Sequence, residues 1–490
     1  MHYYASMRSA PVATAIPLAI CFLPSISLGQ VPSKEMAQAM ANYGAKVAAS
    51  AIFVSGRTLE SVLEQEFAPA RPLEAMLNPL LKFHVDRESL KVTCTLDQAR
   101  ASAQMLPSLG CTLLHSNQFP SQSRRAFLVT SPTKQVTNDG ALWPHSERTA
   151  KTANTAIDRN ALSRAIDRAF AEPDKIKSVN TRAIVVVHKG QLVAERYGKG
   201  FHKQMPLPGW SMSKTLTSAL IGKRVGENLF ELGATVKKGR RSKSNTANTS
   251  DGSKDLIPPT CRNLLTMTAG LEWNEDYYDP SSDALRMLFG SADHAEVYRN
   301  RPQTVSAGEL FQYASGATNL LCKELRKTFE QDQEYWNYPH EFFQQLRMQT
   351  AVLETDPSGT FVGSSYCYAS ARDWARLGLL YLQDGMFFGQ RILPKGWVKQ
   401  STTPVDASNG RYGYQIWLNR AANNDQAKQR KWPDLPADLF SMDGHEGQYC
   451  VISPSAELVI VRLGCTKSGG FDLHGLLRDI HAAVGFRSPK

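Results

Sequence analysis

The clearest hydrophobic patterns along the chain form two pairs, one in its middle and one at its end. Apolar residues recur at every fourth position of residues 158–172, which predicts an amphipathic helix. Residues 181–198 hold two apolar runs around a Lys-Gly pair, which predicts a β-hairpin. Residues 449–464 predict a second hairpin, and residues 473–485 predict a last helix. These four elements together predict a single sheet built from both ends of one domain.

The other patterns are less regular. Residues 264–382 are largely helical in pattern, so we expect an inserted helical layer or subdomain. Nearer the N-terminus, residues 50–56 and 90–96 predict strands, and residues 58–67 predict a helix. Residues 130–155 are polar with little periodicity, which predicts a linker.

These patterns divide the chain into three parts. In residues 1–29, Arg8 precedes a mostly apolar stretch, which predicts a secretory signal peptide, with a retained membrane anchor as the alternative. Both interpretations predict export, to the periplasm or the medium, and the second adds membrane association through the N-terminus. Residues 30–154 predict a small N-terminal domain of unknown role with its linker, and residues 155–490 predict the main domain.

Composition limits the classes of partner. The chain has 490 residues, of which 42% are hydrophobic and 21% charged, as in an ordinary globular protein. The net charge of +11 fits an anionic partner, such as a membrane surface or acidic cell-wall polymer, or simple solubility. No basic stripe interleaved with aromatic residues indicates nucleic-acid binding. Part of the excess positive charge lies in residues 236–255, whose composition predicts a solvated loop.

The cysteines carry little information about function. There are eight, and none belongs to a Cys-x-x-Cys pair, so zinc ribbons and thioredoxin-like sites are not expected. We predict no metal and no cofactor. Cys94 and Cys111 lie close enough in the sequence to pair in an exported protein, although the sequence does not decide this.

Ser211 and Lys214 form a Ser-x-x-Lys pattern within "GWSMSKTLTSAL". A serine hydroxyl needs a neighbouring base to become a nucleophile, and residues three apart lie on one face of a helix. A lysine shielded from water binds its proton less tightly and can act as that base. The apolar residues that follow at helical spacing favour this hypothesis, although an ordinary helix start has the same pattern. A second match, "SPTK" at residues 131–134, contains proline in a polar context and predicts a loop.

A site of this kind also needs a proton donor for the leaving group. Tyr-Ala-Ser occurs three times, and Tyr313 is the best candidate because Tyr4 lies in the predicted signal and Tyr368 precedes a helix-capping pattern. Signatures of other chemistries are missing from the sequence: the Gly-x-Ser-x-Gly elbow, the His-Glu-x-x-His zinc motif, and the phosphate-binding and dinucleotide-binding loops.

Three stretches of the chain resemble, in order, the three motifs of the penicillin-recognising serine hydrolases: Ser211 to Lys214, Tyr313 to Ser315 and His445 to Gly447. Flanking stretches such as "NLLTMTAGLEWNEDYYDP" and "RILPKGWV" resemble the β-lactamase-related branch. The 6-aminohexanoate-dimer hydrolases look most similar, through "FQY" and "EDYYDP". The resemblance covers about residues 158–490 and leaves the N-terminal domain unexplained.

The resemblance implies a mixed α/β fold of the β-lactamase/transpeptidase type. Its antiparallel central sheet would be flanked by helices, with a largely helical inserted subdomain, and here a small N-terminal domain would be added.

The resemblance also implies roles for particular residues. Ser211 would be the acylated nucleophile, Lys214 would share its proton, and Tyr313 would act as general acid and base. Ser315 stands where many relatives carry Asn, and His445 stands where β-lactamases carry Lys. The backbone N–H groups of Ser211 and Gln448 would form the oxyanion hole. The implied substrate-binding or oxyanion set is Ser315, His445, Gly447, Gln448 and Tyr277.

The function expected from this resemblance is that of a serine hydrolase acting through an acyl-enzyme on a linear amide or ester. The substrate would be a small molecule or a short oligoamide or peptide. The alternatives are a D-alanyl-D-alanine carboxypeptidase or β-lactamase-like enzyme, and, in another class, a slowly acylating cell-wall binding or sensor module. His445 disfavours efficient β-lactam turnover, because histidine is mostly uncharged at neutral pH and lysine is not. The sequence makes no prediction of oligomeric state.

Overall fold

The computed structural model describes residues 33–68, 72–115, 142–149, 157–172, 178–237, 256–421, 427–467 and 470–486. The predictions for residues 1–29, for most of the 130–155 linker, for "SPTK" at 131–134 and for most of the basic loop lie outside the described residues. Among the helices that are described, none is both long and apolar enough to span a bilayer.

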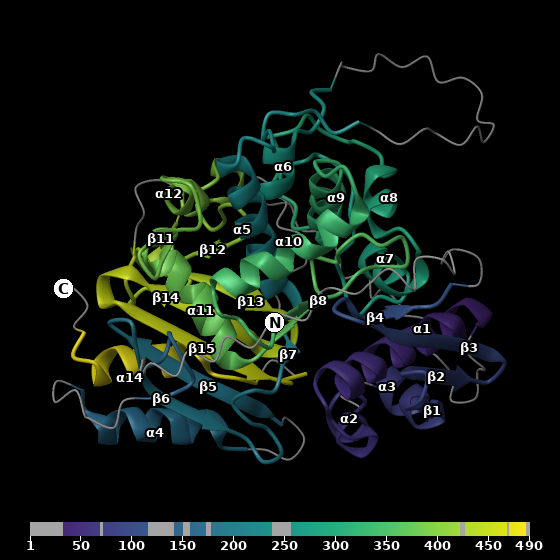
Figure 1. Ribbon diagram of the computed structural model, residues 1–490, viewed down its shortest axis with the longest axis horizontal. Helices are drawn as coiled ribbons and strands as arrows, with labels where there is room; N and C mark the ends of the chain where they lie inside the picture. The colour runs from purple at the N-terminus through teal and green to yellow at the C-terminus, as the bar shows by residue number, and fades with distance from the viewer. Residues whose placement is uncertain are drawn as a thin grey trace, which may run out of the picture.

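A six-stranded antiparallel sheet forms the centre of the main part of the molecule (Figure 1). The two predicted hairpins supply four of its strands, and they meet where β15 pairs with β5. The prediction of one sheet built from both ends of the domain is therefore confirmed. In spatial order the strands are Trp417–Leu418 (β12), Phe440–Gly444 (β13), Gln448–Ser453 (β14), Leu458–Gly464 (β15), Thr181–His188 (β5) and Gln191–Tyr197 (β6).

Helices cover both faces of this sheet. Successive side chains of a strand point to opposite faces, so Ile184 and Val186 of β5 join one hydrophobic cluster while Val185 and Val187 join another. The first cluster includes residues of α4 and α14, and the second includes residues of α5 and α11. These helices span Arg159–Phe170 (α4), Leu473–Ala483 (α14), Ser213–Gly226 (α5) and Ala371–Leu382 (α11).

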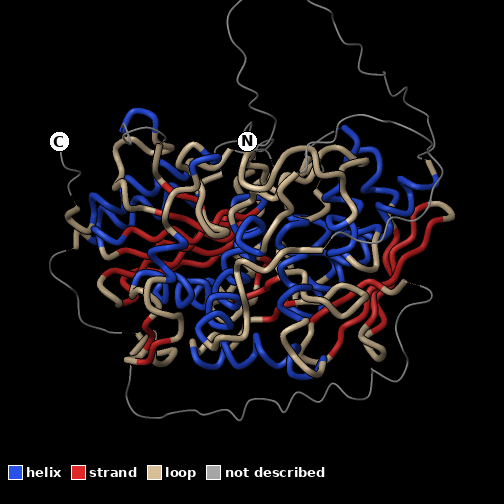
Figure 2. The backbone as a smooth tube through the Cα atoms, turned by 90° about the horizontal axis from the view of Figure 1, so that it is seen from above, coloured by secondary structure: helices blue, strands red, loops and turns tan. Residues whose placement is uncertain are grey.

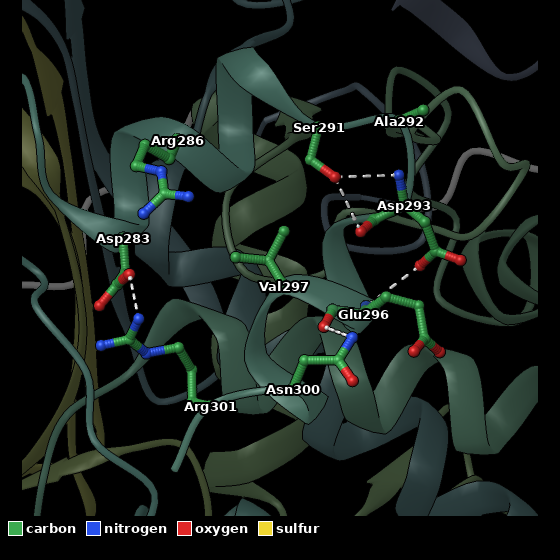
Figure 3. Close-up of a pocket in the computed structure, with 9 residues that line it drawn as sticks. All are labelled: Asp283, Arg286, Ser291, Ala292, Asp293, Glu296, Val297, Asn300 and Arg301. Carbon is green, nitrogen blue, oxygen red and sulfur yellow. Dashed lines mark hydrogen bonds and ion pairs between the residues drawn. The ribbon is translucent and has the colours of Figure 1, made fainter. Parts of the chain in front are cut away.

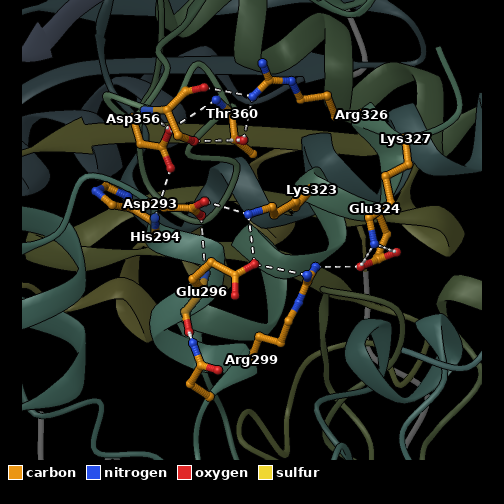
Figure 4. Close-up of polar contacts among 12 residues, drawn as sticks. Asp293, His294, Glu296, Arg299, Lys323, Glu324, Arg326, Lys327, Asp356 and Thr360 are labelled. Atoms are coloured by element: carbon orange, nitrogen blue, oxygen red, sulfur yellow. Dashed lines mark hydrogen bonds and ion pairs between the residues drawn. The ribbon is translucent and has the colours of Figure 1, made fainter. Parts of the chain in front are cut away.

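The middle of the chain is largely helical, as the sequence predicts. Its helices are Cys261–Leu265 (α6), Asp283–Gly290 (α7), His294–Arg299 (α8), Ser315–Arg326 (α9) and Asp332–Gln345 (α10), and Trp397–Ser401 (α12) follows later. Ion pairs join α8 to α9 (Figure 4): Lys323 Nζ lies 2.5 Å from Asp293 Oδ2 and 2.8 Å from Glu296 Oε1.

Two short sheets complete the main part. Leu207–Pro208 (β7), Cys367–Ala369 (β9) and Val352–Leu353 (β8) form one, with β9 in the middle. Met386–Phe387 (β10) and Gln390–Arg391 (β11) form the other. The β7–β9 pair is important for the site, because the chain passes directly from β7 to the Ser211 turn.

The described residues between 33 and 115, here called the N-terminal unit, have their own sheet and their own hydrophobic cluster. Figure 2 shows the red strands of this sheet, at the right, apart from those of the central sheet. Helix α1 packs on β2 and β3 of the antiparallel order β1-β2-β3-β4. The elements are Lys34–Ala49 (α1), Leu59–Gln65 (α2), Pro72–Leu77 (α3), Lys82–Asp86 (β1), Lys91–Leu96 (β2), Ala99–Leu106 (β3) and Gly110–Leu113 (β4).

One prediction for this unit is wrong. Residues 50–56 were expected as a strand, but Ser50–Val54 continues α1 as a π-helical turn, with Ala51 and Ile52 buried. A short apolar run fits a buried helix as well as a strand, and only the preceding helix decides between them. The strand predicted at residues 90–96 and the helix predicted at 58–67 are confirmed as β2 and α2.

Cys94 and Cys111 do not pair. Both are buried as free thiols, on β2 and β4 respectively, and β3 lies between these two strands. Two strand spacings, about 9.5 Å, exceed the reach of a disulfide, whose Cα atoms lie at most about 7 Å apart.

Candidate active site

Ser211 lies in a short 3₁₀ turn, Trp210–Met212, that leads into helix α5. The turn is anchored to β9, since the N–H of Gly209 donates to the carbonyl of Cys367 over 2.8 Å. It also packs against the central sheet: a Cβ added at Gly444, the last residue of β13, would lie only 2.2 Å from the carbonyl oxygen of Gly209. The sheet and β9 thus fix the half-buried Ser211 at the N-terminal end of α5.

Lys214 is almost completely buried one turn further along. Its Nζ donates to Ser211 Oγ over 2.9 Å, to Ser315 Oγ over 3.0 Å and to the carbonyl oxygen of Ser364 over 3.1 Å. Burial lowers the pKa of Lys214 to about 8, and the negative charge of Glu275 opposes this shift. A fraction of the amine is therefore neutral near physiological pH and able to take the proton of Ser211.

The carboxylate of Glu275 accepts several hydrogen bonds close to Lys214. Its carboxylate accepts the Ser315 hydroxyl and the Ser315 N–H, the latter over 2.8 Å. It also accepts the Tyr277 hydroxyl over 2.9 Å and the indole N–H of Trp273 over 2.5 Å. The Tyr277 hydroxyl lies 3.2 Å from Ser315 Oγ as well. Ser315 thus connects the buried carboxylate to the amine of Lys214, and this network holds the amine in place.

The ring of Tyr313 also lies close to Lys214. Its ring is mostly buried, and Lys214 Nζ lies 4.8 Å from the ring centroid. The ring stacks on Trp417 of β12, with centroids 5.5 Å apart, and meets Tyr412 edge to face. These contacts define the position of the phenol beside the Ser211–Lys214 pair.

His445 lies between two aromatic side chains of the site. Its ring centroid is 5.8 Å from that of Trp210, at 88°, and 5.0 Å from that of Tyr277, at 31°. His445 begins the turn between β13 and β14, in which Glu446 has a φ of +58°. Trp210, His445 and Tyr277 together form an aromatic wall next to Ser211.

Gly447 and Gln448 complete that turn. Gly447 has a φ of +83°, and a Cβ there would lie 2.4 Å from Arg462 Nη1, so only glycine fits. Arg462 is fully buried and donates to the carbonyl of Gly447 over 2.7 Å. The side chain of Gln448 is buried too: its amide group donates to the carbonyl of Gly464 over 2.7 Å and accepts the Gly464 N–H over 2.9 Å. Only the backbone of Gln448 is thus available for the predicted oxyanion role.

The structure therefore brings the predicted residues of all three motifs and Tyr277 into one region. Sequence reasoning missed three contributors, namely Glu275, the carbonyl of Ser364 and Trp210. The signal was present, since Glu275 begins the "EDYYDP" stretch and Trp210 precedes the nucleophile candidate. Their contacts join segments far apart in the chain, however, and no local pattern reveals them.

A separate pocket of about 510 Å³ lies at α7, α8 and the connection between them (Figure 3). None of the predicted site residues lines it. Its acidic side chains are accompanied by basic ones, and Asp283 pairs with Arg301 over 3.3 Å. Within the part of the chain that the structure describes, no group of three or more His, Cys, Asp or Glu residues could hold a metal ion.

Comparison with known proteins identifies a family and a relative. The family model described as Beta-lactamase matches residues 166–483. A 6-aminohexanoate-dimer hydrolase of Paenarthrobacter ureafaciens is 23% identical over 301 residues, which are 59% of this chain and 74% of the relative.

The chain is also similar to solved structures. A candidate 6-aminohexanoate-dimer hydrolase from Bacillus anthracis superposes with a TM-score of 0.50 at 23% identity, over 66% of this chain and 81% of its own. An octameric penicillin-binding protein homologue from Pyrococcus abyssi gives a TM-score of 0.48 at 16% identity, over 68% of this chain and 79% of its own. The expected β-lactamase/transpeptidase-like fold is therefore confirmed.

Proposed function

The chain belongs to the beta-lactamase family, and from this premise we propose that it is a serine hydrolase that cleaves linear amides or esters through an acyl-enzyme on Ser211. The observation that carries this proposal is the buried Lys214 amine, 2.9 Å from Ser211 Oγ, with its pKa lowered to about 8. A serine and a base at this separation form an activated nucleophile.

In the proposed acylation, neutral Lys214 takes the proton of Ser211 as its Oγ attacks the substrate carbonyl carbon. The negative oxygen that develops is stabilised by the backbone N–H groups of Ser211 and Gln448. Tyr313 passes a proton to the leaving amine or alkoxide, the carbon–nitrogen or carbon–oxygen bond breaks, and the acyl group stays on Ser211. Water then attacks the ester with the same groups acting in reverse, which releases the acid and restores the serine.

The aromatic wall supports a linear substrate. Trp210, Tyr277 and His445 offer flat, apolar faces that can pack along an alkyl chain. His445 stands where β-lactamases carry a permanent cation for the β-lactam carboxylate, so the wall does not offer that contact at neutral pH. The 6-aminohexanoate-dimer hydrolases among the relatives indicate the substrate class: short oligoamides of ω-amino acids, or esters of similar shape.

The decisive experiment combines labelling and turnover of wild type and Ser211→Ala. A fluorophosphonate should label wild type but not the variant, and hydrolysis of nitrophenyl acetate and of the 6-aminohexanoate dimer should fall by several orders of magnitude. The matched control is Ser131→Ala in the second Ser-x-x-Lys sequence, which should keep full activity. Activity that survives Ser211→Ala, or disappears in Ser131→Ala, would contradict the proposal.

The same experiment distinguishes an enzyme from a sensor. A sensor would be labelled at Ser211 and release one equivalent of nitrophenol without continued turnover. An enzyme continues to release product after the first equivalent. We expect continued release, because the triad candidates Ser211, Lys214 and Tyr313 lie together.

A further inference from the structure

Glu354 is a buried carboxylate of the main part whose partners come from the N-terminal unit. Lys46 forms an ion pair with it, and both side chains are nearly inaccessible to solvent. Ser50 Oγ lies 2.9 Å from its Oε1, and the N–H of Cys111 donates to the same oxygen over 2.6 Å. A Cβ at Gly110 would lie 2.5 Å from Glu354 Cγ, so the unit closes tightly around this side chain.

The backbone of Glu354 is tied to the segment that reaches the catalytic lysine. Its N–H donates to the carbonyl of Tyr366 over 3.0 Å, and its carbonyl accepts the N–H of Val362 over 2.9 Å. Between these two residues lies Ser364, whose carbonyl accepts a hydrogen bond from Lys214 Nζ. A shift of Glu354 would therefore be transmitted to an acceptor of the catalytic amine.

Lys46 is also linked to the aromatic wall through Tyr366. Its Nζ lies 3.9 Å from the ring centroid of Tyr366, which is a cation–π contact. Tyr366 in turn meets Trp210 edge to face, with centroids 6.4 Å apart. Trp210 directly precedes Ser211 and has a φ of +48°, an uncommon backbone conformation that the surrounding contacts must maintain.

A second contact of the N-terminal unit lies near the turn of the third motif. Glu66 pairs with Arg182 of β5 over 2.6 Å, with both side chains buried. Cys465 follows β15 directly. Its Sγ lies 3.6 Å from the carbonyl oxygen of Gln65 and 3.4 Å from Glu446 Oε2. Glu446 follows His445 in the turn of the third motif. The unit thus supports both the Ser364–Tyr366 side and the His445 side.

We propose that the N-terminal unit is a built-in positioning element of the active site and that Lys46 is its main positioning residue. Lys46 touches no reacting atom. It holds Glu354 and Tyr366, and through them it positions the Ser364 carbonyl and Trp210 of the aromatic wall. This role rests on the proposed serine-hydrolase function.

The test is the turnover per competent site in Lys46→Met. Competent sites are counted by fluorophosphonate titration, and the maximal rate of nitrophenyl acetate hydrolysis is divided by that count. We expect kcat per titrated site to fall about tenfold to a hundredfold, as for small misplacements of catalytic groups. The matched control is Leu96→Ala, which opens a cavity in the core of the N-terminal unit on β2, a strand that carries none of the contact residues named above, and it should keep kcat per site.

A purely structural Lys46 would lower the number of titrated sites but not the turnover of each, and that result would overturn the proposal. If Lys46→Met does not fold, Glu354→Gln breaks the same pair while keeping the side-chain shape, and the same loss per site is expected. Failure of the underlying function would look different, because Ser211→Ala would then keep its activity and its label.

Discussion

At the residue scale, the site depends on an almost completely buried amine. Lys214 is 1% exposed and donates to three oxygen atoms, of Ser211, Ser315 and Ser364. Sequence spacing predicted the Ser211–Lys214 pair, because i and i+3 always meet on a helix. Glu275, whose charge raises the pKa of this amine, lies 61 residues further along the chain. Only the fold brings it close to Lys214.

The first prediction concerns the pH dependence of hydrolysis. Lys214 must be neutral to take the proton of Ser211, and burial lowers its pKa to about 8. We therefore expect kcat/KM for a linear amide to rise about tenfold per pH unit below pH 8 and to level off above it. A profile measured from pH 6 to 10 checks this. A rate that stays constant between pH 6 and 8 would contradict it.

The second prediction tests the electrostatic effect of Glu275 on Lys214. Its negative charge raises the pKa of Lys214 against the effect of burial. Glu275→Gln removes that charge, so the midpoint of the kcat/KM profile should move to lower pH. Glu272→Gln is the control, because this exposed carboxylate of the same loop pairs with Arg301 at the surface. A midpoint that rises in Glu275→Gln, or moves equally in both variants, would show that Glu275 does not act on the amine.

At the scale of elements, the turn between β13 and β14 presents His445 to the site. The positive φ of Glu446 and Gly447 sets the course of the turn, and the buried Arg462 holds the carbonyl of Gly447. Of the two strands beside this turn, β14 belongs to the hairpin predicted at residues 449–464, whereas β13 was not predicted. The placement of His445 between Trp210 and Tyr277 was not, because three separate elements contribute those rings.

The third prediction tests this turn as the origin of substrate preference. His445→Lys supplies a permanent cation for a β-lactam carboxylate, and a charged hydrogen bond contributes about 1.5–3 kcal/mol. The ratio of kcat/KM for nitrocefin to that for a nitrophenyl ester should rise on the order of ten- to a hundredfold. His202→Lys, in an exposed loop, is the control for added charge. An unchanged ratio in His445→Lys would place specificity elsewhere in the site.

At the scale of the whole molecule, buried charges join the N-terminal unit, with its own hydrophobic core, to the main part. Glu66 of the N-terminal unit pairs with Arg182 of the central sheet and with Arg57 of its own unit. Burial alone would raise the pKa of Glu66, but Arg182 and Arg57 outweigh it, so the pKa is lowered. Such a carboxylate stabilises the folded state above its unfolded pKa of about 4.3, and this stabilisation is lost as the pH falls through the folded value.

The fourth prediction follows from that cluster. Glu66→Gln leaves two buried arginines without their anion, which should lower the free energy of unfolding by about 3–5 kcal/mol at pH 7. The difference from wild type should shrink as the pH falls below the unfolded pKa of about 4.3, because the unfolded wild-type carboxylate then takes up its proton. Denaturant unfolding at several pH values measures both. Asp167→Asn, which breaks the exposed pair with Arg196, should cost less than about 1 kcal/mol. Equal losses in the two variants would contradict this account.

The sequence by itself determined the family motifs, their order and the hairpins and helices of the main sheet, because periodicity and close spacing are local properties. It also indicated Ser211, Lys214 and Tyr313 as the residues to examine. Only the tertiary structure decided that residues 50–54 continue a helix, since a short apolar run has no preferred form until its neighbours bury it. Likewise only the fold brings Glu275 to Ser315 and Lys46 to Glu354. These pairs are 40 and 308 positions apart in the chain, and contacts at such separations produce no periodic pattern in the sequence.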